Sequence, residues 1–355
     1  MKKILFAIAS IALIFSSCSN DDNLSGNPAE GQKAVLNIAI NAPVMGTRAG
    51  GTPTVDKVTN FTAFVINADG NIQATFTSTD GTPLTDQPVT TLAKQVYVVA
   101  NLPAGLTPAP VTKADLEAKL IDLIGTQFTS RTATGQTDTD LNFVQDVSGN
   151  YKATASVALK FVAARVTVKI VNGMTGYNAA NIDGNLVLNH VALLNVMKES
   201  KLFGTSLVPA TKSFYTGLTP SDKDNWPTAP VEKDELKDAI AANDFDATYH
   251  YYVFENDAKL ANEFPTIVAI EGTFNDEKIY FPIHLAPYEN WTTGATNASV
   301  ERGKSYDITV TLKVDPTNPG GGSTPDPTDP VVTASVDISV TLTDWEPVVL
   351  GKEFN

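Results

Sequence analysis

Residues 61–81 read FTAFVINADGNIQATFTSTDG, and this stretch decides the fold class. Its first run, 61–67, is rich in β-branched and aromatic residues and ends at the turn pair Asp69-Gly70. The second run, 73–79, has a similar character and ends at Asp80-Gly81. Short runs bounded by Asp-Gly pairs are typical of β-strands joined by tight turns. The stretch therefore predicts a fold made of short strands.

The same signals recur along the chain, and helical patterns are few. Further strands are expected at 34–42, 95–100, 153–171, 186–196, 248–255, 265–274, 278–285 and 304–314. One helix is expected at 113–124, where Thr112 can cap the start and Gly125 can close the end, and a short charged helix at 232–243. Many short strands with one or two short helices predict a mostly β protein built as β-sandwiches. The length of 355 residues suggests two such domains or one large β domain, and for two domains the boundary is placed near residue 170.

Composition narrows the classes of function. The formal net charge is −14, so the chain has no electrostatic footprint for nucleic acid. Its one cysteine, Cys18, excludes a disulfide framework and a cysteine-based zinc site. The three histidines, His190, His250 and His284, lie far apart in sequence, which leaves little for chemistry that needs clustered imidazoles.

The sequence contains no complete catalytic or metal-binding motif. Asp138-Thr139-Asp140 opens like a calcium loop, but Phe143 stands where the turn glycine belongs and Gly149 where the terminal glutamate belongs. The sequence has no glycine-rich phosphate loop, no GxSxG and no HExxH. We therefore expect no enzyme activity, no metal and no cofactor.

The N-terminus has the features of an export signal. Residues 1–22 read MKKILFAIASIALIFSSCSNDD, with Lys2 and Lys3 ahead of an apolar run at 4–15. This run is too short to span a membrane and is typical of a secretory signal peptide, here 1–17. It ends close to Cys18, which resembles a lipobox, where the cysteine is acylated (palmitate is one such acyl group) and anchors the chain to a membrane. The alternative is an ordinary signal peptide with a chance cysteine.

The C-terminal region divides into a linker and a strand. Residues 316–330, PTNPGGGSTPDPTDP, are dominated by proline and glycine and cannot form a regular element. Beyond them apolar and polar residues alternate strictly, which is the pattern of a strand with one buried face. The apolar positions are Ala334, Val336, Ile338, Val340 and Leu342.

Taken in order, several segments of the chain resemble the fimbrillins, the type V pilins of Bacteroidia. They are the lipobox at Cys18, the strand 34–42, GTRAG at 46–50, VYVVANLP at 96–103, AARVTVKI at 163–170, YYVFEN at 251–256, ERGKSYDITVTLK at 301–313 and the terminal strand with Trp345. The resemblance covers almost the whole chain. The departure from the family is the linker 316–330, which is longer than expected between the last two strands.

The resemblance implies two β-sandwich domains of transthyretin-like topology and a route of assembly. The precursor reaches the outer membrane as a lipoprotein, and Asp21 and Asp22 resemble a surface-export tag. An arginine-specific protease then cuts between Arg48 and Ala49, the first strand is lost, and the C-terminal strand of another copy or of a related pilin subunit fills the groove. The product is an extracellular fimbrium that supports adhesion. The implied divisions are a signal peptide at 1–17, a lipidated propeptide with the first strand at 18–48, an N-terminal β-sandwich at 49–170, and a C-terminal β-sandwich at 171–355 with a donor strand at 331–355.

Other interpretations remain open at this point. Arg48 can be an ordinary surface arginine, and the terminal strand can simply complete its own domain. The chain can also be a monomeric surface lipoprotein that binds glycan, for example through the aromatic run Tyr249-His250-Tyr251-Tyr252, or a tip or anchor component of a fimbria. A hydrolase is supported by nothing beyond export and acidity.

Overall fold

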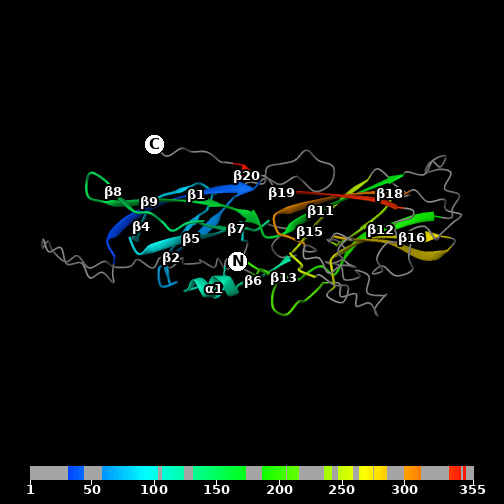
Figure 1. Ribbon diagram of the computed structural model, residues 1–355, viewed down its shortest axis with the longest axis horizontal. Coiled ribbons are helices and arrows are strands. Elements are labelled where there is room, and N and C mark those ends of the chain that lie inside the picture. Colours follow the sequence, from blue (N-terminus) through cyan, green and yellow to red (C-terminus); the bar gives the residue numbers. More distant parts are fainter. Residues whose placement is uncertain are drawn as a thin grey trace, which may run out of the picture.

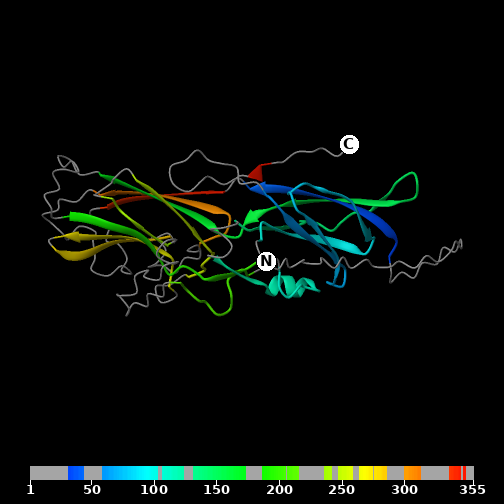
Figure 2. The same ribbon diagram turned by 180° about the vertical axis from the view of Figure 1, so that it is seen from behind.

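The computed structural model consists of two β-sandwiches placed end to end along the long axis of the molecule (Figure 1, Figure 2). The structure describes residues 31–43, 58–102, 106–123, 131–172, 186–204, 206–215, 236–241, 247–258, 264–274, 276–285, 300–312, 336–344 and 347–348. Among these residues, none of the helices is both long and apolar enough to cross a membrane. The mostly β fold predicted from the sequence is confirmed.

The first sandwich consists of two five-stranded sheets. One sheet contains β4 (Leu84–Thr90), β1 (Lys33–Pro43), β9 (Tyr151–Ala158) and β8 (Val144–Gln145) in that order, with the short β20 (Pro347–Val348) beside the end of β1. The other has the order β10 (Lys160–Phe161), β7 (Ala133–Gln136), β5 (Ala93–Ala100), β2 (Phe61–Asn67) and β3 (Ile72–Ser78). The side chains of β2 and β5 are mostly buried, because these strands lie at the centre of their sheet.

The stretch that decides the fold class forms the hairpin of β2 and β3, which pair antiparallel. The side-chain oxygen of Asn67 accepts hydrogen bonds from the backbone N–H groups of Asp69 (3.0 Å) and Asn71 (2.9 Å). Gly70 has a φ of 80°, in the left-handed region that glycine adopts without strain. The predicted strand, turn and strand are therefore confirmed.

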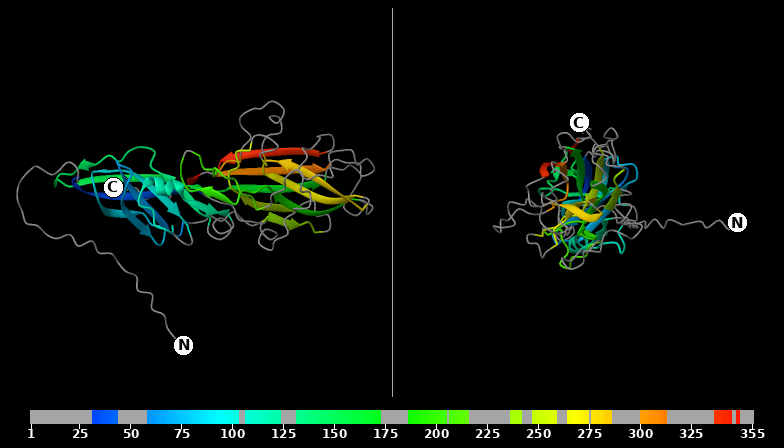
Figure 3. Two further views of the ribbon diagram at one scale, coloured as in Figure 1. Left: turned by 90° about the horizontal axis from the view of Figure 1, so that it is seen from below. Right: turned by 90° about the vertical axis from the view of Figure 1, so that its right-hand side faces the viewer.

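The second sandwich consists of two four-stranded sheets, which Figure 3 shows from below and along the long axis. Their orders are β15 (Thr248–Val253), β11 (Ala164–Asn172), β18 (Lys304–Leu312) and β19 (Val336–Asp344), and β14 (Lys237–Ala239), β12 (Leu186–Leu194), β16 (Ile267–Phe274) and β17 (Glu277–His284). The chain passes between the sandwiches after β10 and before β11, so a division at residue 170 would fall inside β11.

A two-stranded sheet joins the sandwiches. Its strands are β6 (Leu120–Asp122), from the N-terminal half of the chain, and β13 (Glu199–Lys201), from the C-terminal half, and they pair antiparallel. Because β6 and β13 are far apart in sequence, only the folded chain brings them together.

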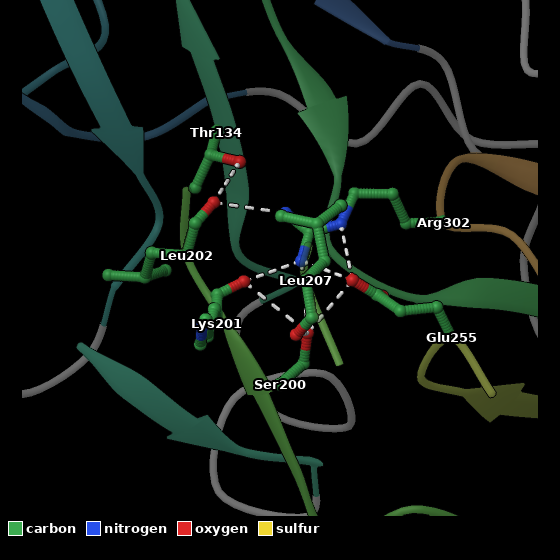
Figure 4. Close-up of polar contacts among 7 residues, drawn as sticks. All are labelled: Thr134, Ser200, Lys201, Leu202, Leu207, Glu255 and Arg302. Atoms are coloured by element: carbon green, nitrogen blue, oxygen red, sulfur yellow. Dashed lines mark hydrogen bonds and ion pairs between the residues drawn. The ribbon is translucent and has the colours of Figure 1, made fainter. Parts of the chain in front are cut away.

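A buried ion pair lies at the same junction (Figure 4). Arg302 Nη2 is 2.6 Å from Glu255 Oε1, and the two side chains are only 10% and 8% exposed. Arg302 Nη1 also donates to the carbonyl of Leu202 (3.0 Å), which accepts a second hydrogen bond from Thr134 Oγ1 of β7 (3.2 Å). A buried charge must be paired to be tolerated. The carbonyl of Leu202 therefore links this ion pair to β7 of the first sandwich.

Both helix predictions need correction. The helix expected at 113–124 is α1, Lys113–Ala118, which starts with the predicted cap: Thr112 Oγ1 accepts from the backbone N–H of Asp115, and the Asp115 carboxylate accepts from the backbone N–H of Thr112. It ends early because Lys119 is extended and the next residues form β6. The helix expected at 232–243 is wrong in its described part, where β14 pairs with β12. Gly125 lies outside the described residues.

Candidate functional site: the groove of the first strand

β1 is an interior strand of its sheet. β4 runs antiparallel to it along residues 33–38, and β9 runs parallel to it along residues 34–41. The strand predicted at 34–42 is therefore confirmed, and it has a partner on each side. An interior strand contributes both its edges to the sheet, so its backbone groups are paired in two directions.

One face of β1 supplies a row of core side chains. Alternate residues of this row are buried, with exposures between 0% and 7%. They are Ala34, Leu36, Ile38, Ile40 and Ala42. The residues between them are half-buried or more exposed, as expected for a strand whose side chains alternate between two faces.

Side chains and loops fix the register of β1. The side-chain oxygen of Asn37 accepts a hydrogen bond from the backbone N–H of Asp86 on β4 (2.9 Å). Before the strand, Gln32 and Thr91 exchange two bonds, of 2.9 and 3.0 Å. Near the end of the strand, the carbonyl of Asn41 accepts from the N–H of Leu159 (2.8 Å).

Removing β1 would leave a groove with defined chemistry. Its walls would be the unpaired edges of β4 and β9, and its floor the apolar side chains that had packed on the buried row. Unpaired backbone groups and exposed apolar surface are both costly in water. Such a groove favours another extended segment with the same alternation.

The C-terminal strand β19 lies at the edge of its own sheet. It pairs antiparallel with β18 over nine positions, from Lys304 opposite Asp344 to Leu312 opposite Val336. No second neighbour is described for it. In the single chain the terminal strand therefore completes its own domain, which is one of the alternatives given above.

The segment after β19 reaches the first sandwich. In β20, Val348 pairs with Ala42 and Pro347 with Pro43, at the end of β1. The C-terminal segment therefore pairs with β1, the strand whose removal would open the groove.

The starts of β1 and β19 lie at opposite ends of the molecule. β18 begins at the junction, where the N–H of Gly303 donates to the carbonyl of Ala163 (3.1 Å), and it runs outward. Its partner β19 therefore starts at the outer end of the second sandwich. β1 starts beside the β8–β9 hairpin at the outer end of the first sandwich and runs toward the junction (Figure 1).

The turn of that hairpin is built around the carboxylate of Asp146. Asp146 Oδ1 accepts from the backbone N–H groups of Ser148 and Asn150 (both 2.9 Å), and Asp146 Oδ2 lies 3.4 Å from Lys152 Nζ. The hydrogen bond from Asn150 is the main reason that the pKa of Asp146 is lowered. Val147 is fully exposed at the tip of this hairpin.

Several predicted site residues fall outside the described part of the chain. They are Cys18, Arg48, Ala49 and Ala334, so the expected lipidation and cleavage sites remain predictions. Val336, Ile338, Val340 and Leu342 lie in β19, as the alternating pattern predicted.

The aromatic run proposed as a sugar platform belongs to β15. Tyr249, Tyr251 and Tyr252 are buried, and His250 Nδ1 is 3.2 Å from Thr167 Oγ1 on β11. The run is thus a packed strand. Among the described residues, no group of three or more His, Cys, Asp or Glu side chains could hold a metal ion.

Sequence reasoning missed two strands that border the first-strand groove. β4 reads LTDQPVT, and its polar residues and Pro88 conceal it, since proline is unusual inside strands. β20 has only two residues and carries no periodic signal. Both depend on pairing with β1, which no local pattern reveals.

Comparison with known proteins agrees with this architecture. Residues 34–190 match the family described as major fimbrial subunit protein (FimA), and residues 163–345 match the C-terminal domain of the FimA-like major fimbrial subunit proteins. The major fimbrium subunit FimA type-2 of Porphyromonas gingivalis is 22% identical, over 98% of this chain and 99% of that protein.

Solved structures show the same fold. A candidate cell adhesion protein from Bacteroides eggerthii is 26% identical with a TM-score of 0.65, covering 90% of this chain and 98% of that one. A fimbrilin from Porphyromonas gingivalis is 20% identical with a TM-score of 0.62, covering 90% and 99%. The chain therefore belongs to the FimA-like major fimbrial subunit family, whose members are structural subunits of fimbriae and not enzymes.

Proposed function

We propose that this fimbrial subunit polymerises by exchanging its first strand for the C-terminal segment of another copy. In this scheme the chain is cut after Arg48, β1 leaves, and residues 331–355 of the next subunit enter the groove. The observation that carries the proposal is the position of β1 between β4 and β9, where its removal opens a groove from one end of the sandwich to the other.

The C-terminal segment has the pattern that the groove requires. Its five alternating apolar residues match the buried row of β1 position by position, with alanine first and isoleucine third in both. Burying the four larger side chains contributes about 6–12 kcal/mol before association costs are subtracted. Addition of a strand to a sheet in this way is a known mode of recognition.

The position of the terminal segment supports a head-to-tail arrangement. β19 is an edge strand, so its release breaks one ladder only. Its chain leaves β18 at Leu312, at the outer end of the second sandwich. Residues 313–335, fully extended, would span about 75 Å. If residues 331–355 extend away from this outer end, they reach the start of the groove on the next subunit. They would then run in the same direction as the lost β1, parallel to β9.

The arginine content favours a single cut. The sequence has four arginines, at positions 48, 131, 165 and 302. Arg302 is held in the buried ion pair, and Arg165 donates two hydrogen bonds to Ser305 (3.1 and 2.8 Å) from within β11. A protease needs an extended and accessible segment. Of the four, Arg48 lies in a run of small residues, MGTRAGG at 45–51.

The lipid on Cys18 then has a temporary role. It would hold the precursor at the outer membrane, with residues 18–48 as its tether, until cleavage frees the subunit for the extracellular fimbrium. An adhesive role for the fimbrium and a place in the stalk complete the proposal. The monomeric glycan-binding alternative loses its best candidate, because the aromatic run at 249–252 is packed inside a sheet.

The experiment is polymerisation of the purified precursor after treatment with an arginine-specific protease. We expect ladders on a denaturing gel run without boiling, and N-terminal sequencing of the product should start at Ala49. The variant Arg48→Lys should stay intact and monomeric under the same protease. A chain ending at Pro330 should be cut but remain monomeric, because it lacks the donor segment. Polymers from that truncated chain would contradict the proposal.

A further inference from the structure

The first-strand groove has a cavity at its outer end. About 920 Å³ in volume, it lies beside the first residues of β1, the start of β9, the end of β4 and the strand β3 of the opposite sheet. Its apolar lining includes Ala34, Val35, Ala74, Phe76 and Val89. Phe76 is only half-buried, although it packs against the core.

Removal of β1 would join this cavity to the groove. Three of its lining residues, Lys33, Ala34 and Val35, belong to β1 and would leave with it. β3 and β9 would keep their pairing with β2 and β8, while β4, whose one described strand partner is β1, would stay connected to the sandwich through the chain that joins it to β3 and β5. The cavity would then form the open end of the groove, at the place where an incoming segment arrives first.

We propose that Val331 and Val332 of a second copy fill this cavity when its terminal strand enters the groove. The inference rests on the proposed strand exchange. With the two apolar rows aligned, Ala334 takes the place of Ala34, so the two valines arrive just before the start of the strand. They are apolar residues that follow directly on the polar, proline-rich linker 316–330.

The incoming segment cannot follow the path of the chain that precedes β1. That path turns at Gly31, whose φ is 68°, and a Cβ atom there would lie 2.7 Å from Leu92 Cγ and 3.0 Å from Thr90 Oγ1. The matching residue of the donor is Val331, and a β-branched residue is strained in this conformation. The donor must therefore approach by another route, and Thr90 is itself part of the cavity wall.

The test compares full-length chains that are cleaved and allowed to polymerise. In the donor, Val331→Ser with Val332→Ser should make subunits leave preformed polymers at least about tenfold faster, because two apolar side chains lose their burial. The matched control is Thr324→Ser with Thr328→Ser in the same linker, which should behave like the wild type. Val331→Ala with Val332→Ala is the second variant, with a smaller effect in the same direction.

A second pair of variants changes β3, with one substitution inside the cavity and a control outside it. Thr75 and Thr77 are both exposed on β3, but only Thr75 lines the cavity. Thr75→Trp should fill the cavity and slow polymer formation, while Thr77→Trp should not. Before cleavage, every variant should have the same free energy of unfolding as the wild-type precursor.

The outcomes separate the two proposals. If the wild-type chain is cut and forms no polymer, strand exchange itself fails, and the cavity assignment with it. If the wild type polymerises but the valine variants dissociate at the wild-type rate, strand exchange stands and the cavity assignment is overturned. Equal effects of Thr75→Trp and Thr77→Trp would overturn it as well.

Discussion

The variant Ile38→Ala tests whether β1 belongs only to the precursor. Ile38 is fully buried at the centre of β1, in register with Leu84 of β4 and Ala155 of β9. In the precursor its side chain contributes to the core of the first sandwich. In a polymer made by strand exchange the residue is absent, since it is lost with residues 18–48.

The magnitude follows from what the substitution removes. Isoleucine loses three carbon groups on replacement by alanine, worth about 0.8 kcal/mol each in transfer free energy. The cavity left behind adds to this, so the free energy of unfolding should fall by about 2–5 kcal/mol. Ala39 lies next in the strand on the half-buried face, and Ala39→Ser should change the free energy much less.

The assay has two parts. Urea unfolding of the uncleaved chain, followed by circular dichroism, should show the loss of stability in Ile38→Ala. After cleavage and polymerisation, polymers of this variant should dissociate at the same urea concentration as wild-type polymers. The complementary variant Ile338→Ala should weaken the polymers, because the proposed exchange would put Ile338 in the place of Ile38.

One result would refute the reasoning. Polymers of Ile38→Ala that are weaker than wild-type polymers, by an amount similar to the loss in the precursor, would mean that β1 stays in place after assembly. The first-strand groove would then not be the interface between subunits.

Three further predictions concern the packing of the two sandwiches and their junction. Replacing Arg302 by leucine leaves Glu255 buried without its charged partner, so the free energy of unfolding in urea should fall by about 3–5 kcal/mol; a change below 1 kcal/mol, as for an exposed pair, would argue against a buried role. Gly135→Ala places a Cβ atom 2.2 Å from the carbonyl oxygen of Ala158, so a loss of about 1–3 kcal/mol, seen as a lower Tm, is expected, and an unchanged Tm would show that the backbone yields freely. Burial raises the pKa of Tyr306 to about 12, while an unfolded tyrosine ionises near pH 10, so its contribution is complete below pH 10 and is lost as pH rises toward 12. Urea titrations across that range should show a shallower decline for Tyr306→Phe, and equal slopes would mean that this hydroxyl titrates normally.

Local patterns predicted most strands because their causes are local. Asp-Gly turns closed β2 and β3, the apolar residues Leu36, Ile38 and Ile40 at every second position marked β1, and the strict alternation at 334–343 marked β19. The cap at Thr112 was also predictable, since a capping side chain bonds residues only three positions away.

The errors have non-local causes. The pattern at 113–124 favours a helix, but residues 120–122 form β6 because they pair with residues 199–201 of β13 at the junction. Residues 237–239 are likewise drawn into a sheet by β12. Pairing across long stretches of chain overrides helix propensity, which is worth only fractions of a kcal/mol per residue.

The sequence by itself determined the strand-rich fold, the alternating rows of β1 and β19, and the resemblance to fimbrillins, and it predicts an export signal. Those features depend on residue order and composition alone. Only the tertiary structure decided that β1 is an interior strand between β4 and β9, that its start and the start of β19 lie at opposite ends, and that a cavity lies where the groove begins. The physical reason is that a strand's neighbours are set by hydrogen bonds and packing between distant segments, which no local period encodes.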